Sequence, residues 1–414
     1  MSKRWRGAAL VGVIAASIVF SGPAAQADGI RDAEYWLSSY GIRSAWSTTK
    51  GGGVVIAVID TGVDGSVPEL QGAVVGGADF SGLGSPNGQT PVGSGENEHG
   101  TMVASLAAGR GTSDADGVIG SAPEASILAI SIGFGEGTMS SDDQVAAAVR
   151  FAVDNGADVI NMSLTRNSLE WPESWDDAFL YAMDNDVVVV AAAGNRGSGT
   201  TQVGAPATMP GVLTVAGVDV DGAASFDASA QGTTISVAAP SEDLVGVVPG
   251  GDHVIWAGTS GAAPIVSGIV ALVRAAYPEL DAANVINRII ATARDRGITG
   301  ADPIYGYGLI DAQAAVTASV PSVTENPMGS LAEWITLYRR ADSTPVPLPT
   351  FTAPPVSPPA AAAGPTSPLG VLMPTVILLR NVGIPLGVLV LFGALLIALV
   401  VVVVRRFWRA RRAG

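Results

Sequence analysis

The chain has 414 residues, of which 48% are hydrophobic, a mean hydropathy of +0.39 and a net charge of −15 at neutral pH. This length suits one large domain with appendages, and the hydropathy predicts apolar segments outside the core. The acidic balance repels phosphate backbones, so no nucleic acid is expected as a partner. The chain contains no cysteine, which excludes disulfides and leaves stability to core packing.

The N-terminus has the pattern of a secretory signal peptide. Three basic residues lie within the first six positions, an apolar stretch covers 8–20, and Ala25-Gln26-Ala27 supplies a small-residue cleavage site. The apolar stretch is short for a membrane span, which favours cleavage before Asp28 over retention as an anchor. Residues 1–27 are therefore predicted to be a signal peptide.

From residue 54 onward, short β-branched apolar runs alternate with helical patterns. Runs of this kind are typical of strands buried on both faces of a parallel sheet. This alternation predicts an α/β doubly wound domain over 28–318, with a mainly parallel sheet, helices on both faces and a ligand crevice beyond the carboxyl ends of the strands. The predicted strands are 54–59, 127–132, 159–164, 187–193, 212–218 and 235–238, and the predicted helices are 99–108, 143–154, 174–185, 260–277 and 281–293.

Three segments follow the predicted domain. Residues 319–381 form a Pro/Ala-rich linker whose densest part, 345–368, favours an extended spacer, although 331–340 has the spacing of a short amphipathic helix. Residues 382–404 form an uncharged apolar run of 23 residues, enough to cross a hydrocarbon core of about 30 Å, so a transmembrane helix is favoured over a buried core helix. The tail 405–414 carries five arginines, which places it in the cytoplasm by the positive-inside rule.

The net charge also differs between the two ends of the chain and the part between them. The signal region carries three positive charges and the tail five, so a total of −15 leaves −23 for the part between them. Such a surface is compatible with basic substrates, but net charge alone does not locate a negative pocket.

Three short motifs place polar side chains at the predicted crevice. Asp60 ends the first strand, in Val58-Ile59-Asp60-Thr61-Gly62. His99 opens a helix in His99-Gly100-Thr101, and Ser260 opens another in Gly258-Thr259-Ser260-Gly261-Ala262-Ala263-Pro264. A serine hydroxyl becomes nucleophilic when a neutral imidazole takes its proton and a buried carboxylate holds that imidazole in the right tautomer. Asp60, His99 and Ser260 are therefore the predicted catalytic residues.

Each motif alone has a plainer interpretation. Gly-Thr-Ser is most often a turn or a helix cap, and Asp-Thr-Gly also occurs in aspartic proteases. Their joint occurrence, each in a suitable local context, favours the catalytic interpretation. His253, the only other histidine, precedes an apolar run and is interpreted as a strand-end residue rather than a base.

The helix that begins near Ser260 suits a developing negative charge. Pro264 lacks an N–H group and is tolerated only near a helix start, which keeps Ser260 in the first turn. Unpaired N–H groups and the positive end of the helix dipole favour an oxyanion there. Gly258 and Gly261 leave room for a substrate backbone to approach.

These motifs and their order resemble the subtilisin-like serine proteases, in which the triad runs Asp, His, Ser along the chain. The resemblance covers residues 28 to about 316 by motif. It implies that Ser260 attacks the peptide carbonyl, His99 moves the proton and Asp60 orients His99.

Two further segments acquire roles from this resemblance. Asn195 ends the motif Ala191-Ala192-Ala193-Gly194-Asn195 and is expected to donate to the oxyanion, with a loop cap as the alternative. The stretch Asn161-Met162-Ser163-Leu164-Thr165 resembles the family's substrate-binding edge, which a peptide joins as an added strand. The predicted substrate-binding residues are Ser163, Leu164, Thr165, Ala193 and Gly194.

The chain departs from the family pattern at three positions. Thr165 stands where a glycine is usual, which affects the depth and preference of the specificity pocket. Gly261 stands where a larger residue is common, and Glu98 replaces the glycine that commonly precedes the histidine. None of these changes removes a catalytic group. The loop 81–97, rich in Gly, Ser and Pro, is expected to border the cleft.

The overall plan resembles one branch of the family, the mycosins, which are membrane-anchored proteases of type VII secretion systems in actinobacteria. Only about 26 residues separate the predicted cleavage site from the first strand, too few for the inhibitory domain that most secreted relatives carry there. Instead, Arg31-Asp32-Ala33-Glu34-Tyr35-Trp36-Leu37 and Gly41-Ile42-Arg43-Ser44-Ala45-Trp46 form a short lead-in. Beyond residue 316 the resemblance rests on architecture alone.

We therefore expect a single-pass membrane protein with an extracytoplasmic serine endopeptidase domain. Its expected partners are protein or peptide substrates and a type VII secretion membrane complex. No cofactor or metal is expected for the chemistry, and although calcium often stabilises the family, no ligands can be assigned. Two alternatives stay open: a non-catalytic scaffold of a secretion complex and a leader-peptide processing protease. His99 disfavours the acid-active relatives that have Glu in place of the histidine.

Overall fold

The structure is a computed structural model that describes residues 29–94, 97–113 and 116–339. The contacts along the chain separate residues 1–344 from 345–414, and every described residue belongs to the first of these units. The predicted signal peptide 1–27, transmembrane helix 382–404 and tail 405–414 lie outside the described residues.

A seven-stranded parallel sheet forms the centre of the described part, in the order β2-β3-β1-β4-β5-β6-β7. Its central strands are almost continuous runs of Val, Ile and Ala with both faces buried, as parallel sheets require. The strands are β1 (Val55–Asp60), β2 (Val74–Asp79), β3 (Ser126–Ser131), β4 (Val159–Met162), β5 (Val188–Ala192), β6 (Leu213–Val218) and β7 (Val237–Pro240).

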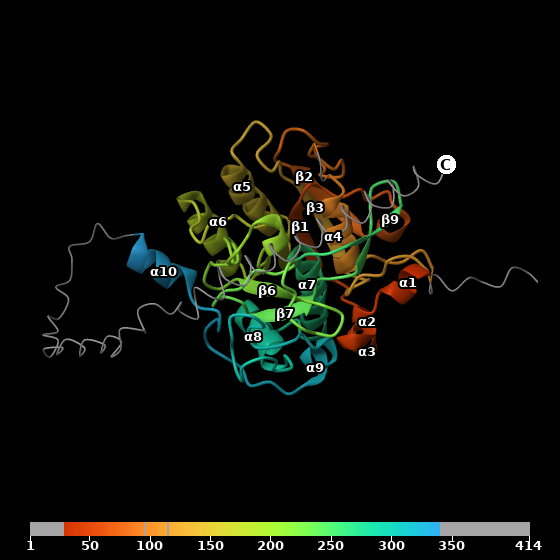
Figure 1. Cartoon of the computed structure of the whole chain (residues 1–414). Helices are drawn as coiled ribbons and strands as arrows, with labels where there is room; N and C mark the ends of the chain where they lie inside the picture. The colour runs from red at the N-terminus through yellow and green to blue at the C-terminus, as the bar shows by residue number, and fades with distance from the viewer. Residues whose placement is uncertain (1–28, 95–96, 114–115, 340–414) are drawn as a thin grey trace, which may run out of the picture. The chain divides into compact units, whose positions relative to one another are not determined.

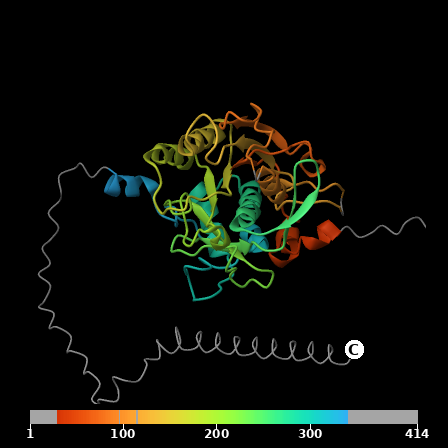
Figure 2. The same ribbon diagram turned by 45° about the horizontal axis from the view of Figure 1, so that its top comes forward.

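Two pairs of helices cover the sheet. α5 (Ser141–Asp154) packs against α6 (Glu173–Asp184), and α4 (His99–Ala108) packs against α7 (Thr259–Ala276). In Figure 1 and Figure 2 these pairs lie on opposite sides of the strands. Within the described residues, α7 alone is long and apolar enough to cross a membrane, but 83% of it is buried inside the fold. Its composition is therefore that of a core helix.

The prediction of a mainly parallel α/β sheet with helices on both faces is confirmed. The predicted strands and helices recur with their ends shifted by at most two residues, as with α8 (Ala282–Ala291). The sequence reasoning missed β2, because two glycines interrupt its short apolar pattern. It also missed the separate antiparallel hairpin of β8 (Leu244–Val247) and β9 (His253–Trp256).

The lead-in forms three short helices that are packed into the domain. They are α1 (Gly29–Ala33), α2 (Trp36–Ser39) and α3 (Ile42–Ala45). The side chains of Trp36, Leu37 and Ile42 are fully buried. α3 contacts α9 (Ala312–Thr317), near the other end of the domain. This segment is therefore part of the hydrophobic core.

Arg31 connects the lead-in to the loop that follows α4. Its guanidinium donates to the carbonyl oxygens of Asp116 (2.8 Å) and Gly117 (2.9 Å) and forms an ion pair with Glu34 at 3.1 Å. Arg31 is 8% exposed and the Glu34 side chain 0%. Because each charge is buried against the other, removal of one would leave the second unpaired.

The packed part of the chain continues past residue 318, where the linker is predicted to begin. The predicted helix near 331–340 is present as α10 (Leu331–Tyr338), which contacts α6. Trp334 packs on Trp171 with 4.4 Å between ring centroids, and Arg339 forms an ion pair with Asp176 at 3.0 Å. The first twenty residues or so of the predicted linker thus lie against the domain.

We predict that Trp36→Ala lowers the free energy of unfolding by about 3–5 kcal/mol, because it leaves a large cavity under the lead-in. Chemical denaturation of the purified protein measures this change. Ser38→Ala, at an exposed position of α2, is the matched control and should change stability by less than about 0.5 kcal/mol. A Trp36→Ala protein as stable as this control would show that the lead-in is dispensable.

Candidate active site

Asp60 and His99 form a close pair in which the carboxylate is buried and the imidazole is partly exposed. Asp60 is the last residue of β1 and its side chain is 0% exposed, while that of His99 is 20% exposed. His99 Nδ1 lies 2.8 Å from Asp60 Oδ1 and 3.0 Å from Oδ2. A carboxylate accepts hydrogen bonds, so Nδ1 carries the proton and Nε2 presents a lone pair when the ring is neutral. This is the tautomer that a general base requires.

The neighbouring motif residues explain how this pair is held. The hydroxyl of Thr61 accepts from the Gly100 N–H (2.9 Å) and donates to the carbonyl of Asn97 (3.1 Å), so it joins the end of β1 to the start of α4. A Cβ atom on Gly100 would lie only 2.2 Å from the carbonyl oxygen of Gly62. The glycine of the His-Gly-Thr motif is therefore required by close backbone contact.

Ser260 is the second residue of α7, in the first turn as predicted. Its hydroxyl donates to the carbonyl of Ser163 (3.1 Å), and the Ser163 hydroxyl donates to the carbonyl of Ser260 (2.8 Å). Gly258 precedes the helix with φ +147°, a conformation that favours glycine. These contacts fix the start of α7 against the end of β4.

Asn195 follows β5 and is held by its side-chain oxygen. Oδ1 accepts from the backbone N–H and the hydroxyl of Thr259, both at 2.8 Å. This pattern orients the amide so that Nδ2 remains a donor, and a Cβ on Gly258 would lie 2.9 Å from that nitrogen. The Asn195 amide therefore lies beside the residues that precede Ser260.

A cleft of about 320 Å³ brings five of the predicted site residues together, whereas Asp60 and Asn195 lie outside its lining. It contains His99, Ser260 and the predicted substrate-binding stretch from Ser163 to Thr165. It also contains residues that the sequence reasoning did not assign, among them one carboxylate. The further lining residues are Thr61, Gly93, Ser94, Phe134 and Glu136.

Two of these additions could have been found from the sequence. Phe134 and Glu136 follow the end of β3, at the carboxyl edge where parallel sheets bind ligands. Glu136 accepts a hydrogen bond from Ser94 at 2.8 Å, which joins its loop to the predicted cleft-border loop 81–97. The expectation that loop 81–97 borders the cleft is thus confirmed at its end.

The base of that loop is fixed by Asp79, the last residue of β2. Its carboxylate accepts from the Ser81 hydroxyl (2.5 Å), the Ser131 hydroxyl (2.8 Å) and the Gly84 N–H (3.0 Å). Burial by itself raises the pKa of Asp79, but these hydrogen bonds outweigh it and lower the pKa overall. Asp79 therefore stays ionised and keeps the loop anchored.

The predicted pocket residues Ala193 and Gly194 lie outside the cleft lining, but Gly194 is next to it. A Cβ on Gly194 would be 3.2 Å from the methyl carbon of Thr165. The Thr165 hydroxyl donates to the carbonyl of Arg166 at 3.2 Å, which fixes the side chain. The threonine that replaces the family's usual glycine thus fills space between two predicted substrate-binding segments.

The structure also accounts for the other departures from the family pattern. A Cβ on Gly261 would lie 2.3 Å from Leu244 and 3.3 Å from Trp256, so the β8–β9 hairpin occupies the space of a larger residue. The Glu98 backbone has φ −70°, which needs no glycine. His253 begins β9 and lies 2.6 Å from Glu69 at Nε2, consistent with the strand-end interpretation.

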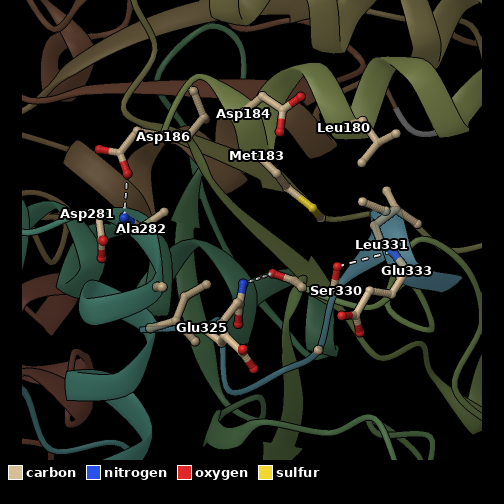
Figure 3. A pocket seen from close by; sticks show the side chains of 17 residues that line it. Leu180, Met183, Asp184, Asp186, Asp281, Ala282, Glu325, Ser330, Leu331 and Glu333 are labelled. Carbon is tan, nitrogen blue, oxygen red and sulfur yellow. Dashed lines mark hydrogen bonds between the residues drawn. The ribbon is translucent and has the colours of Figure 1, made fainter. Parts of the chain in front are cut away.

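A second hollow of about 440 Å³ lies away from these residues, between α6, α8 and α10 (Figure 3). Carboxylates surround it, but two of them already have structural roles. Asp186 forms an ion pair with Arg274, and Asp281 caps α8. Within residues 29–94, 97–113 and 116–339, no group of three or more His, Asp or Glu is arranged to hold a metal ion.

The comparisons with known proteins agree with this geometry. The profile of the Subtilase family (Peptidase_S8) matches residues 51–308, more than half of the chain. A thermophilic serine proteinase of Bacillus sp. (strain AK1) is 40% identical over 278 residues, which cover 66% of this chain and 64% of that protein. The chain thus spans less than two thirds of the length of this relative.

Two further relatives are mycosins. Mycosin-3 of Mycobacterium tuberculosis is 35% identical over 370 residues, covering 75% of this chain and 76% of that protein. The crystal structure of MycP1 from the ESX-1 type VII secretion system is 32% identical, with a TM-score of 0.61, and covers 71% of this chain and 88% of that one. This chain therefore belongs to the subtilase family of subtilisin-like serine proteases.

Proposed function

We propose that the protein is a membrane-tethered serine endopeptidase that acts outside the cytoplasmic membrane. The observation that carries the proposal is the bond of both Asp60 carboxylate oxygens to His99 Nδ1, in one cleft with Ser260. This arrangement leaves Nε2 of the imidazole as the base. Family membership and the peptide-sized cleft support a peptide bond as the substrate.

In the proposed reaction, the Ser260 hydroxyl turns from the Ser163 carbonyl towards His99, since catalytic hydrogen bonds often form fully only with substrate present. His99 Nε2 takes the hydroxyl proton as Oγ bonds to the peptide carbonyl carbon. The protonated imidazole then gives that proton to the leaving amine, and the C–N bond breaks. Water, deprotonated by His99, attacks the acyl-enzyme carbonyl; the bond to Ser260 Oγ breaks, His99 returns the proton to Oγ, and the carboxylate product leaves.

We assign two hydrogen-bond donors to the negative oxygen of the tetrahedral intermediate. One is the Ser260 backbone N–H at the start of α7, where helical N–H groups lack intrahelical partners. The other is Asn195 Nδ2, because Thr259 occupies the Asn195 oxygen and leaves the nitrogen as the donor. Buried Asp60 stabilises the imidazolium that forms with this charge.

We propose the domain plan 1–27 signal peptide, 28–318 protease domain, 319–381 linker, 382–404 transmembrane helix and 405–414 cytoplasmic tail, with the first part of the linker, up to α10, packed on the protease domain. The apolar run, the arginines after it and the similarity to mycosins support it. MycP1, one of the structural relatives, comes from a type VII secretion system. We therefore propose that this chain processes substrates of such a system and supports its membrane complex.

Two other functions use the same surface. A scaffold of a secretion complex needs no intact Asp60–His99 pair, so the pair favours a role that includes catalysis. A leader-peptide processing protease would have the same catalytic site. The genes next to the one that encodes this chain distinguish that function from a role in secretion.

We predict that Ser260→Ala lowers kcat for an unstructured peptide by about 10⁶-fold, the loss known for the nucleophile of subtilisin. A fluorophosphonate probe should label the wild-type protein at Ser260, identified by peptide mass spectrometry, and should leave Ser260→Ala unlabelled. Ser39→Ala, at an exposed position outside the cleft lining, is the control and should still be labelled. Full activity without the Ser260 hydroxyl would refute the assignment.

We predict that the catalytic and supporting roles separate in cells. Deletion of the gene should stop export of the associated substrates, whereas Ser260→Ala should preserve export but leave the substrates unprocessed, because it removes one oxygen atom and keeps the rest of the surface. Immunoblots of secreted proteins measure both. Equal loss of export in the two strains would show that proteolysis itself drives secretion, and normal export in the deletion strain would point to an independent protease.

We predict that Thr165→Gly widens the pocket for the residue before the scissile bond. The kcat/KM ratio for a large over a small side chain at that position should rise about tenfold, since one pocket methylene is worth about 1–3 kcal/mol. Thr165→Ser keeps the hydroxyl bonded to Arg166 and loses only the methyl group, so it should give part of the increase. An unchanged ratio in both variants would place the pocket elsewhere.

A further inference from the structure

A cavity of about 570 Å³ lies between the lead-in helices and the loop that follows α4, apart from the catalytic cleft. It shares no lining residue with that cleft. Its volume falls in the range of about 300–1,000 Å³ that is common for small-molecule sites. The side chains that matter for its chemistry are Arg31, Arg43, Trp46, Lys50, Arg110 and Glu124.

The charge of this cavity is opposite to that of the protein. The described residues contain twelve Lys and Arg side chains, and four of them line this one cavity. Among the described lining residues, Glu124 is the only carboxylate. In a protein with a net charge of −15, neighbouring carboxylates would ordinarily be expected to neutralise such a group.

Three of the four cations have no carboxylate partner among the described residues. Arg31 is neutralised by Glu34 at 3.1 Å. Arg110 is instead held by backbone carbonyl oxygens, those of Gly72 at 2.9 Å and Pro123 at 3.3 Å. Arg43 and Lys50 are exposed and form none of the described ion pairs. With Glu124 subtracted, the described residues that line the cavity keep an excess of two positive charges.

Two features make the cavity more than a basic surface. The Arg110 guanidinium is fixed by its carbonyl contacts, so little side-chain entropy remains to be lost on binding. Trp46 is fixed by its indole N–H, which donates to the carbonyl of Ser121 at 2.9 Å, and it supplies an apolar wall. A fixed cation beside a fixed ring suits a ligand with an anionic group attached to an organic body.

We propose that this cavity binds an organic phosphate ester. A phosphate monoester carries nearly two negative charges at neutral pH, which match the excess of two cations. Lys and Arg are the side chains that bind phosphate oxygens, and Arg can do so with two parallel hydrogen bonds. The organic body lies against Trp46. The ligand is either a soluble phosphate ester or a phospholipid headgroup, and the site is independent of the proposed peptidase activity.

The lysine content of the chain gives a specific test. Lys3 and Lys50 are its only lysines, so reductive methylation with ¹³C-formaldehyde produces a Lys50 NMR signal that the Lys50→Arg variant identifies. The full chain in nonionic detergent is titrated with glycerol 3-phosphate. The Lys50 signal should shift saturably, whereas uncharged glycerol should leave it unmoved.

Variants test whether the cavity itself binds. Arg43→Gln should weaken glycerol 3-phosphate binding about tenfold, as expected for one charge-assisted hydrogen bond. Arg296→Gln, at an exposed position outside the cavity, is the matched control and should leave the affinity within about twofold. Both side chains are exposed, so both variants should fold, which circular dichroism checks.

Titrations with further ligands identify the source of the phosphate group. Tighter binding of a soluble short-chain phosphatidylglycerol than of glycerol 3-phosphate supports a lipid headgroup, and the reverse order supports a soluble ester. Saturation by inorganic phosphate alone, with the same affinity, would overturn the organic body as part of the ligand. Absence of a saturable shift with all of these probes, or equal affinity in wild type and Arg43→Gln, would overturn the site.

Discussion

The catalytic geometry depends on one contact between backbones, where the start of α4 meets the turn after β1. A Cβ on Gly100 would lie 2.2 Å from the Gly62 carbonyl oxygen, so only glycine lets the two segments approach this closely. The Thr61 hydroxyl then joins them, and His99 is held against Asp60 as a result. The motifs Asp-Thr-Gly and His-Gly-Thr thus pack against each other, and each supplies one side chain, Asp60 or His99, to the pair.

The sequence predicts the regular core well, because buried parallel strands are nearly uniform in Val, Ile and Ala and their ends carry the polar residues of the site. It fails where a residue's role depends on its neighbour in space. Gly261 is an unexplained departure in the sequence, whereas in the structure Leu244 and Trp256 fill the space beside it. Glu136 enters the cleft on a loop that Ser141 and Gln144 of α5 hold through hydrogen bonds to its backbone. β2 was missed because pairing with β3, rather than its own residues, makes it a strand.

The distribution of charge separates two kinds of surface on this acidic protein. The cleft contains Glu136 beside the proposed catalytic residues, so it shares the sign of the whole molecule and is compatible with basic peptides. The described lining of the cavity beside the lead-in has the opposite sign, because Arg43 of the lead-in joins Lys50 and Arg110 there, while Arg31 is paired with Glu34. The same short segment therefore completes the hydrophobic core and changes the local potential.

The lead-in also connects the two ends of the folded part. The Ala312 N–H donates to the carbonyl of Tyr40 at 2.9 Å, and α3 packs on α9. About 270 residues separate these partners, so the contact closes a long loop of the chain. In the proposed export from the N-terminus the lead-in emerges first, yet the surface on which it packs is complete only once α9 has followed. On the proposed topology, the last step of folding then occurs when little more than the linker and the tether remain to cross, so the domain reaches its final form close to the membrane.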